Sequence, residues 1–172
     1  LIHHYGHGGG GMTLSWGTAN EAIALMSGHS STEPVAVIGG GVVGLTTALL
    51  LQRQGLSVTI YAAAFTPHTT SNASAATFYP SHVVAAEHAN EAFGTRLEAA
   101  LRTAYHALQR LAGDRYGVHW MDSYALSERG AASAVPDLET RVYDKVVGDP
   151  SRELPAREHP FRANRAIAGR EL

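Results

Sequence analysis

A glycine-rich turn between two apolar segments constrains the fold of this chain more than any other feature. Residues 35–38 read VAVI, an apolar, largely β-branched run typical of a parallel strand that is buried on both faces. The glycines of 39–44 (GGGVVG) follow at once and lead into a helical pattern over 42–54. A second strand, 57–62, completes a strand–helix–strand unit within about 30 residues. The sequence therefore predicts an α/β fold with a Rossmann-like unit.

Three glycines of the turn, Gly39, Gly41 and Gly44, form the pattern G-x-G-x-x-G. The first permits a tight turn, the second lets a pyrophosphate approach the backbone, and the third lets the helix pack closely on the strand. The helix that begins with Val42 and Val43 adds free N–H groups and partial positive charge for phosphates. The pattern predicts dinucleotide binding, and a glycine turn used only for packing is the alternative.

One element of a dinucleotide site is missing at the end of the second strand. An Asp or Glu at this place normally holds the ribose hydroxyls, whereas residues 61–64 read YAAA. Losing a charged hydrogen bond weakens binding by roughly 1–3 kcal/mol. Since no Arg follows the strand either, a 2′-phosphate is not supported.

Outside this unit the pattern is less regular. Apolar spacing predicts a helix over 13–26 and a longer one over 84–111. Residues 117–126 have the composition of a strand. The tail from Pro150 onwards is rich in proline and charge, so we expect a loop or a truncated edge there.

Composition excludes several classes of function. The net charge of −2 gives no electrostatic reason to bind nucleic acid or a membrane surface. Because cysteine is absent, disulfides, thiolate catalysis and cysteine-ligated metals are excluded. The histidines His3, His4 and His7 lie in a glycine-rich loop without the rigid spacing of a metal site, so no metal is expected. With no secretory signal visible, we expect a cytoplasmic protein with no membrane partner.

Two segments resemble the D-amino-acid oxidase family of FAD-dependent oxidoreductases. The opening LIHHYGHGGGGMTLSWGTA agrees with a family signature at every defined position, and AAAFTPHTTSNASAATFYP resembles the family's Thr-rich flavin loop. The signature normally follows the glycine turn but precedes it here, so the resemblance implies a permuted chain. It also implies a truncated one, because the region with the family's substrate-binding Arg and Tyr has no counterpart.

The resemblance implies FAD as the cofactor. It assigns no catalytic side chain, although the carbonyl of Gly9 would hold the substrate amine. The residues that would contact FAD are Gly39, Gly41, Val42, Val43, Gly44, Thr69 and Thr70 around the phosphates, Asn72, Ala75 and Ala76 beside the isoalloxazine, and Gly8, Gly9, Gly11, Met12 and Thr13 in the opening segment.

The implied reaction is oxidative deamination of a D-amino acid, with hydride passing from the substrate Cα to flavin N5 and O2 reduced to peroxide. Alternatives are a noncatalytic FAD- or nucleotide-binding fragment, a sister flavin amine oxidase or dehydrogenase acting on D-aspartate or glycine, and an NAD-dependent dehydrogenase, which the Thr-rich loop disfavours. We expect little turnover by this chain alone, and a homodimer is one possible assembly.

The implied organisation has four parts. Residues 1–28 form a flavin-binding segment, 29–34 a linker, 35–80 the FAD-binding unit and its loop, and 81–172 the start of an α+β substrate domain with an irregular tail. An extended linker of about six residues spans up to ~20 Å, which suffices for the first segment to dock on the unit that follows it.

Overall fold

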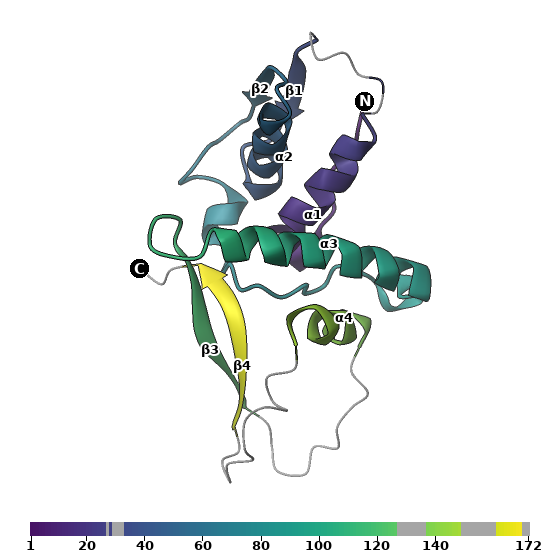
Figure 1. Ribbon diagram of the computed structural model, residues 1–172, viewed down its shortest axis with the longest axis vertical. Coiled ribbons are helices and arrows are strands. Elements are labelled where there is room, and N and C mark those ends of the chain that lie inside the picture. Colours follow the sequence, from purple (N-terminus) through teal and green to yellow (C-terminus); the bar gives the residue numbers. More distant parts are fainter. Residues whose placement is uncertain (27, 29–32, 127–136, 149–160, 170–172) are drawn as a thin grey trace.

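The computed structural model describes residues 1–26, 28, 33–126, 137–148 and 161–169. Figure 1 shows the long helix α3 crossing the molecule, with a strand–helix–strand unit and helix α1 on one side and helix α4 and a pair of strands on the other. The helices are α1 (Gly11–Ala24), α2 (Val42–Arg53), α3 (Glu91–Arg110) and α4 (Leu138–Val147), and the strands are β1 (Val35–Ile38), β2 (Val58–Tyr61), β3 (Val118–Leu126) and β4 (Phe161–Gly169). None of the described helices is both long and apolar enough to span a membrane.

The strand–helix–strand unit forms as the sequence predicts. Strands β1 and β2 pair in parallel, with Val35 opposite Val58 and Ile38 opposite Tyr61. Helix α2 joins them, and Gly55 follows its end with a φ of +85°, a conformation that suits glycine. The predicted α/β class is thus confirmed, with helix and strand boundaries within one residue of those expected.

The burial of β1 differs from the prediction. Val37 is 9% exposed and packs with Ile23 of α1 and Leu51 of α2, whereas Ile38 is 85% exposed. The described sheet has two strands and carries α1 and α2 against one face. The apolar run therefore does not become a strand buried on both sides, and the prediction that it would be was wrong.

Helix α1 belongs to both hydrophobic clusters. Near its start Leu14 packs in a cluster with Leu101 of α3 and Tyr143 of α4, and near its end Ile23 packs with the residues of β1 and α2. Gly17 allows the close approach to α3, because a Cβ there would lie 2.0 Å from the carbonyl oxygen of Ala100. The opening segment is thus docked on the rest of the chain.

The helix predicted over 84–111 begins seven residues later than expected. Asn90 caps α3, and its side-chain oxygen accepts a hydrogen bond from the backbone N–H of Phe93 at 3.0 Å. Residues 86–88 form a short 3₁₀ turn before that cap. An asparagine side chain that accepts a hydrogen bond from a backbone N–H of the first turn stabilises the start of a helix, and Asn90 therefore fixes where α3 begins.

Two elements of the last third, strand β4 and helix α4, were not predicted. Strand β3 agrees with the expectation, but it pairs in antiparallel fashion with β4, so that Val118 lies opposite Gly169. Helix α4 begins after Asp137, whose side chain accepts from the N–H of Thr140 at 2.8 Å. Residues 161–169 are therefore not a loop but a strand at the edge of a two-stranded sheet, while 149–160 and 170–172 lie outside the described residues.

Candidate functional site

The glycine turn has the geometry that its pattern predicts. Gly39 has a φ of +123°, and its N–H donates to the carbonyl oxygen of Tyr61 at 2.8 Å. A Cβ on Gly44 would lie 2.1 Å from the carbonyl oxygen of Gly39, so this helical position must lack a side chain. The first and third glycines therefore make the tight turn and the close packing.

The N-terminus of α2 faces the loop that follows β2. Gly41 precedes the helix and has no side-chain cap, and the first turn carries no acidic residue. The N–H of Val42 donates to Ser71 Oγ at 2.9 Å, and a Cβ on Gly41 would lie 3.1 Å from the same oxygen. Ser71 thus lies where phosphates would bind at a helix N-terminus. It was absent from the predicted residues, although its place directly after Thr69 and Thr70 pointed to it.

Side-chain hydrogen bonds order the Thr-rich loop internally. Asn72 Oδ1 accepts from Thr69 Oγ1 at 2.8 Å, and the N–H of Asn72 donates to the Thr69 carbonyl at 3.0 Å. Thr70 and Ala75 are exposed, and Ala76 has a φ of +55°. The loop thus presents part of its surface to solvent beside α2, while contact of its residues with FAD stays a prediction.

The opening glycines pack on the segment after that loop. A Cβ on Gly8 would lie 1.9 Å from the carbonyl oxygen of His82, and one on Gly9 2.5 Å from that of Ser81. Gly8 also has a φ of +54°, and a Cβ on Gly11 would meet only His7. Glycine is therefore required at positions 8 and 9 by packing alone, whatever their carbonyl groups bind.

The other two predicted residues of the opening segment begin α1. Thr13 is buried, and its hydroxyl donates to the carbonyl of Tyr79 at 2.8 Å and accepts from the Tyr79 N–H at 3.1 Å. Met12, beside it, is half-buried. The structure thus joins the opening segment to 77–83, and the Thr13 side chain is already engaged there.

Helix α4 fixes the segment on which the opening glycines rest. The carboxylate of Glu139 accepts hydrogen bonds from the N–H groups of His82, Val83 and Val84 at 3.1, 2.6 and 3.3 Å. The hydroxyls of Tyr79 and Thr140 lie 2.6 Å apart. Sequence reasoning missed Glu139, because its partners lie more than 50 residues away.

Replacing Glu139 with Ala is expected to lower the free energy of unfolding by about 2 kcal/mol, since three N–H groups lose a charged acceptor. Urea unfolding of the full chain measures this loss. Glu87→Ala, an exposed site in the nearby 3₁₀ turn, serves as the control and should change stability by less than about 0.5 kcal/mol. Equal effects of the two substitutions would contradict the anchoring role of Glu139.

Three alanines follow β2 at the predicted ribose end of the site. Ala62, Ala63 and Ala64 follow β2, and Ala63 is exposed. A Cβ on Gly40 would lie 2.5 Å from the carbonyl oxygen of Ala64, so this strand end reaches the glycine turn. Position 63 therefore lies at the end of β2, where the sequence predicts a ribose-binding carboxylate, and it offers none.

The opening histidines line a cavity of about 230 Å³ between the opening segment, α1 and α3. Its wall includes Glu21 and Arg96, whose carboxylate oxygen and guanidinium nitrogen lie 3.0 Å apart. Burial lowers the pKa of His4 and of His7, and for His4 the neighbouring His7 adds to the shift while Glu21 opposes it. None of the described His, Asp and Glu residues form a group of three suited to a metal ion.

These two histidines make stability depend on pH. Because their folded-state pKa values lie below 6.5, the unfolded chain binds more protons between those values and 6.5. The stabilisation is fully present above the unfolded pKa and is lost as the pH falls through the folded values. Urea unfolding at several pH values between about 7.5 and 5 should show this decline, and a double variant, His4→Gln with His7→Gln, should flatten it. An undiminished decline in that variant would assign the effect to other groups.

Comparison with known proteins bears on this geometry. A family model described as FAD dependent oxidoreductase matches residues 34–167. Segments of 24–27 residues near the N-terminus match D-aspartate oxidase 1 of Caenorhabditis elegans at 65% identity, a D-amino-acid oxidase of Rubrobacter xylanophilus at 71% and human D-aspartate oxidase at 59%. These segments cover 14–16% of this chain and only 7–8% of the relatives. No solved structure gives a significant match.

Proposed function

Because the chain belongs to the family of FAD-dependent oxidoreductases, we propose that it binds FAD with the pyrophosphate at the glycine turn. The observation that carries this proposal is the packing of Gly44 on the carbonyl of Gly39, 2.1 Å from the place of a Cβ. It brings the N-terminus of α2, where the Val42 N–H donates to Ser71 Oγ, next to the end of β1. Backbone N–H groups and the helix dipole favour an anion at such a place.

The neighbouring loop would complete the phosphate site. The Ser71 hydroxyl, already bonded to the Val42 N–H, can turn its own proton toward a phosphate oxygen. Thr69 and Asn72 hold the loop in shape through their mutual hydrogen bonds, and Thr70 lies on its exposed side. Only the ribose end fits poorly, because Ala63 supplies no carboxylate.

We further propose that the reaction is oxidation of D-amino acids. Bound FAD would supply a hydride acceptor that O2 could reoxidise. In the chain, the opening segment would hold the Gly9 carbonyl toward the substrate amine, and α1 would direct the partial positive charge of its N-terminus at the flavin. The names of the relatives, D-amino-acid oxidase and D-aspartate oxidase, favour this substrate class.

Titration of the full chain with FAD, followed by flavin fluorescence, tests the site, and peroxide release tests the reaction. We expect saturable FAD binding that Gly41→Val weakens at least tenfold, because a side chain there occupies the space of a phosphate. Peroxide from D-alanine or D-aspartate, but not from the L-enantiomers, would support the oxidase. FAD binding without peroxide would leave a noncatalytic FAD-binding protein, and a folded chain that binds no FAD would contradict the proposal.

A further inference from the structure

His4 connects the opening segment to two helices at once. Its Nε2 lies 2.9 Å from Thr18 Oγ1 in α1, and its Nδ1 lies 3.0 Å from Thr47 Oγ1 in α2. His7 Nε2 lies 2.8 Å from the same Thr18 oxygen. Helix α2 begins at the glycine turn, and the opening glycines directly follow these histidines. His4 therefore joins, through side-chain hydrogen bonds, the two halves of the proposed flavin site.

Placing the Thr18 proton on its own helix gives one consistent set of directions for these bonds. Thr18 and Thr47 each lie within hydrogen-bond distance of a carbonyl one turn earlier in their own helices, at 3.0 and 2.8 Å. With its proton on that carbonyl, Thr18 Oγ1 uses both lone pairs to accept the Nε2–H groups of His4 and His7. A neutral His4 then has a bare Nδ1, which accepts the proton of Thr47. A protonated His4 must donate there instead, and the Thr47 proton turns back to its own helix.

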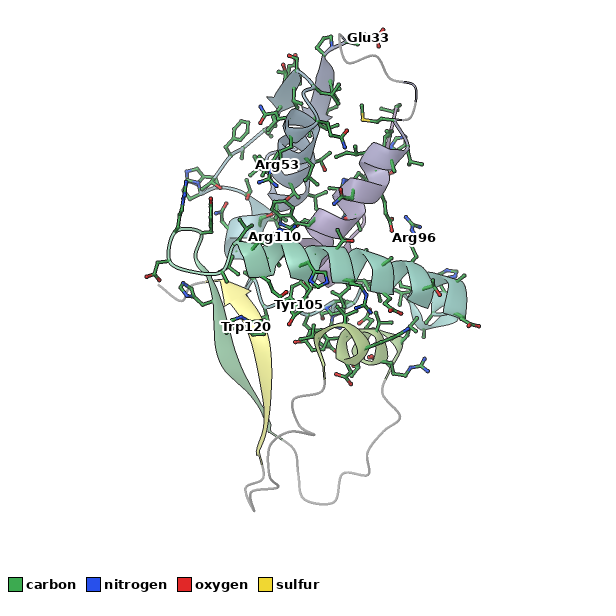
Figure 2. All side chains as sticks on the ribbon, viewed as in Figure 1. Glu33, Arg53, Arg96, Tyr105, Arg110 and Trp120 are labelled. Atoms are coloured by element: carbon green, nitrogen blue, oxygen red, sulfur yellow. The ribbon has the colours of Figure 1, made fainter. Side chains whose placement is uncertain are left out.

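The surroundings disfavour the protonated form. The rings of His4 and His7 lie 5.0 Å apart, and both are half-buried, so a charge on one raises the cost of a charge on the other. The carboxylate of Glu21 is the opposing charge, but Arg96 of α3 already pairs with it, and Figure 2 shows Arg96 on the side of α3 that faces α1. Arg53, the charged residue of α2, lies over the Trp16 ring at 5.5 Å from its centroid.

We propose that His4 is a positioning residue for the flavin site: through its contacts with Thr18 and Thr47 it ties the opening glycine segment to α2 and thereby supports FAD binding. This inference rests on the proposed FAD site. Its geometric part, the hydrogen bond between His4 and Thr47, is a property of the chain without FAD and is testable separately.

Nitrogen-15 NMR of the histidine rings in the FAD-free chain tests the contact. His4→Gln identifies the signals of His4. In the unchanged chain near pH 7.5 we expect the tautomer with its proton on Nε2, and in Thr47→Val we expect a shifted Nδ1 signal. Thr103→Val is the matched control, because Thr103 makes the same hydroxyl-to-carbonyl bond one turn back on α3. A His4 signal that Thr47→Val leaves unchanged would overturn the proposal.

FAD titration of the same proteins tests the positioning role. Thr47→Val should raise the Kd for FAD about 5- to 10-fold near pH 7.5, the equivalent of one lost hydrogen bond, and Thr103→Val should leave it within about twofold. A Kd for FAD that Thr47→Val leaves within about twofold of the unchanged chain would overturn the role of His4. An intact NMR contact in a chain that binds no FAD would instead refute the FAD site and with it this role.

Discussion

Replacing Ala63 with Asp should tighten FAD binding by about 5- to 150-fold, the equivalent of roughly 1–3 kcal/mol for a charged hydrogen bond. The side chain would leave the carboxyl end of β2, beside the glycine turn, where a carboxylate accepts from ribose hydroxyls. Position 63 is exposed, so the larger side chain displaces nothing buried. The gain is measured as the ratio of the two Kd values for FAD.

Ala73→Asp provides the matched control for this gain. It adds the same charge at an exposed alanine of the 3₁₀ turn 70–73, away from the strand end. We expect it to leave the Kd unchanged or to raise it slightly, since the added charge repels the phosphates. If both substitutions tightened binding alike, or if Ala63→Asp had no effect, position 63 would not be the ribose site.

Replacing Gly17 with Ala should lower the free energy of unfolding by about 2–3 kcal/mol, the cost of forcing a methyl group into a packed contact. Helix propensity alone predicts the opposite sign, because alanine stabilises a helix interior by about 1 kcal/mol over glycine. The new Cβ would lie 2.0 Å from the carbonyl oxygen of Ala100, a backbone atom that cannot rotate away. Helices α1 and α3 must therefore move apart and give up part of the contact between them.

Urea unfolding of Gly17→Ala against Asn20→Ala measures this effect. Asn20 lies on the exposed side of α1, so its substitution should change stability by less than about 0.5 kcal/mol. A Gly17→Ala protein more stable than the unchanged chain would show that propensity outweighs the contact between the helices.

Local patterns in the sequence predicted the parts of the fold that depend on neighbours in the chain. The run from Val35 to Ile60 encodes strand, turn and helix within itself, so β1, α2 and β2 begin and end close to their predicted limits. The roles of Gly39 and Gly44 also follow from spacing, and the structure agrees through a φ of +123° and a 2.1 Å approach.

Features that depend on distant partners could not be predicted in this way. The exposure of Ile38 depends on what covers the sheet, and the pairing of β4 with β3 joins segments about 40 residues apart. Asn90 and Asp137 are typical N-cap residues and did mark the starts of α3 and α4 in the sequence. The prediction of helices from apolar spacing did not use this signal. In the site, Glu139 bonds to N–H groups 55–57 positions away, and no local pattern reveals such a contact.

The membership of α1 in both hydrophobic clusters has a consequence for cooperativity. Its first half completes the packing of α3 and α4, and its second half completes that of β1 and α2. Detachment of this one helix would expose apolar surface on both sides of the molecule together. Thermal unfolding should therefore proceed as a single transition, in which the strand–helix–strand unit and the remainder lose their structure at the same temperature.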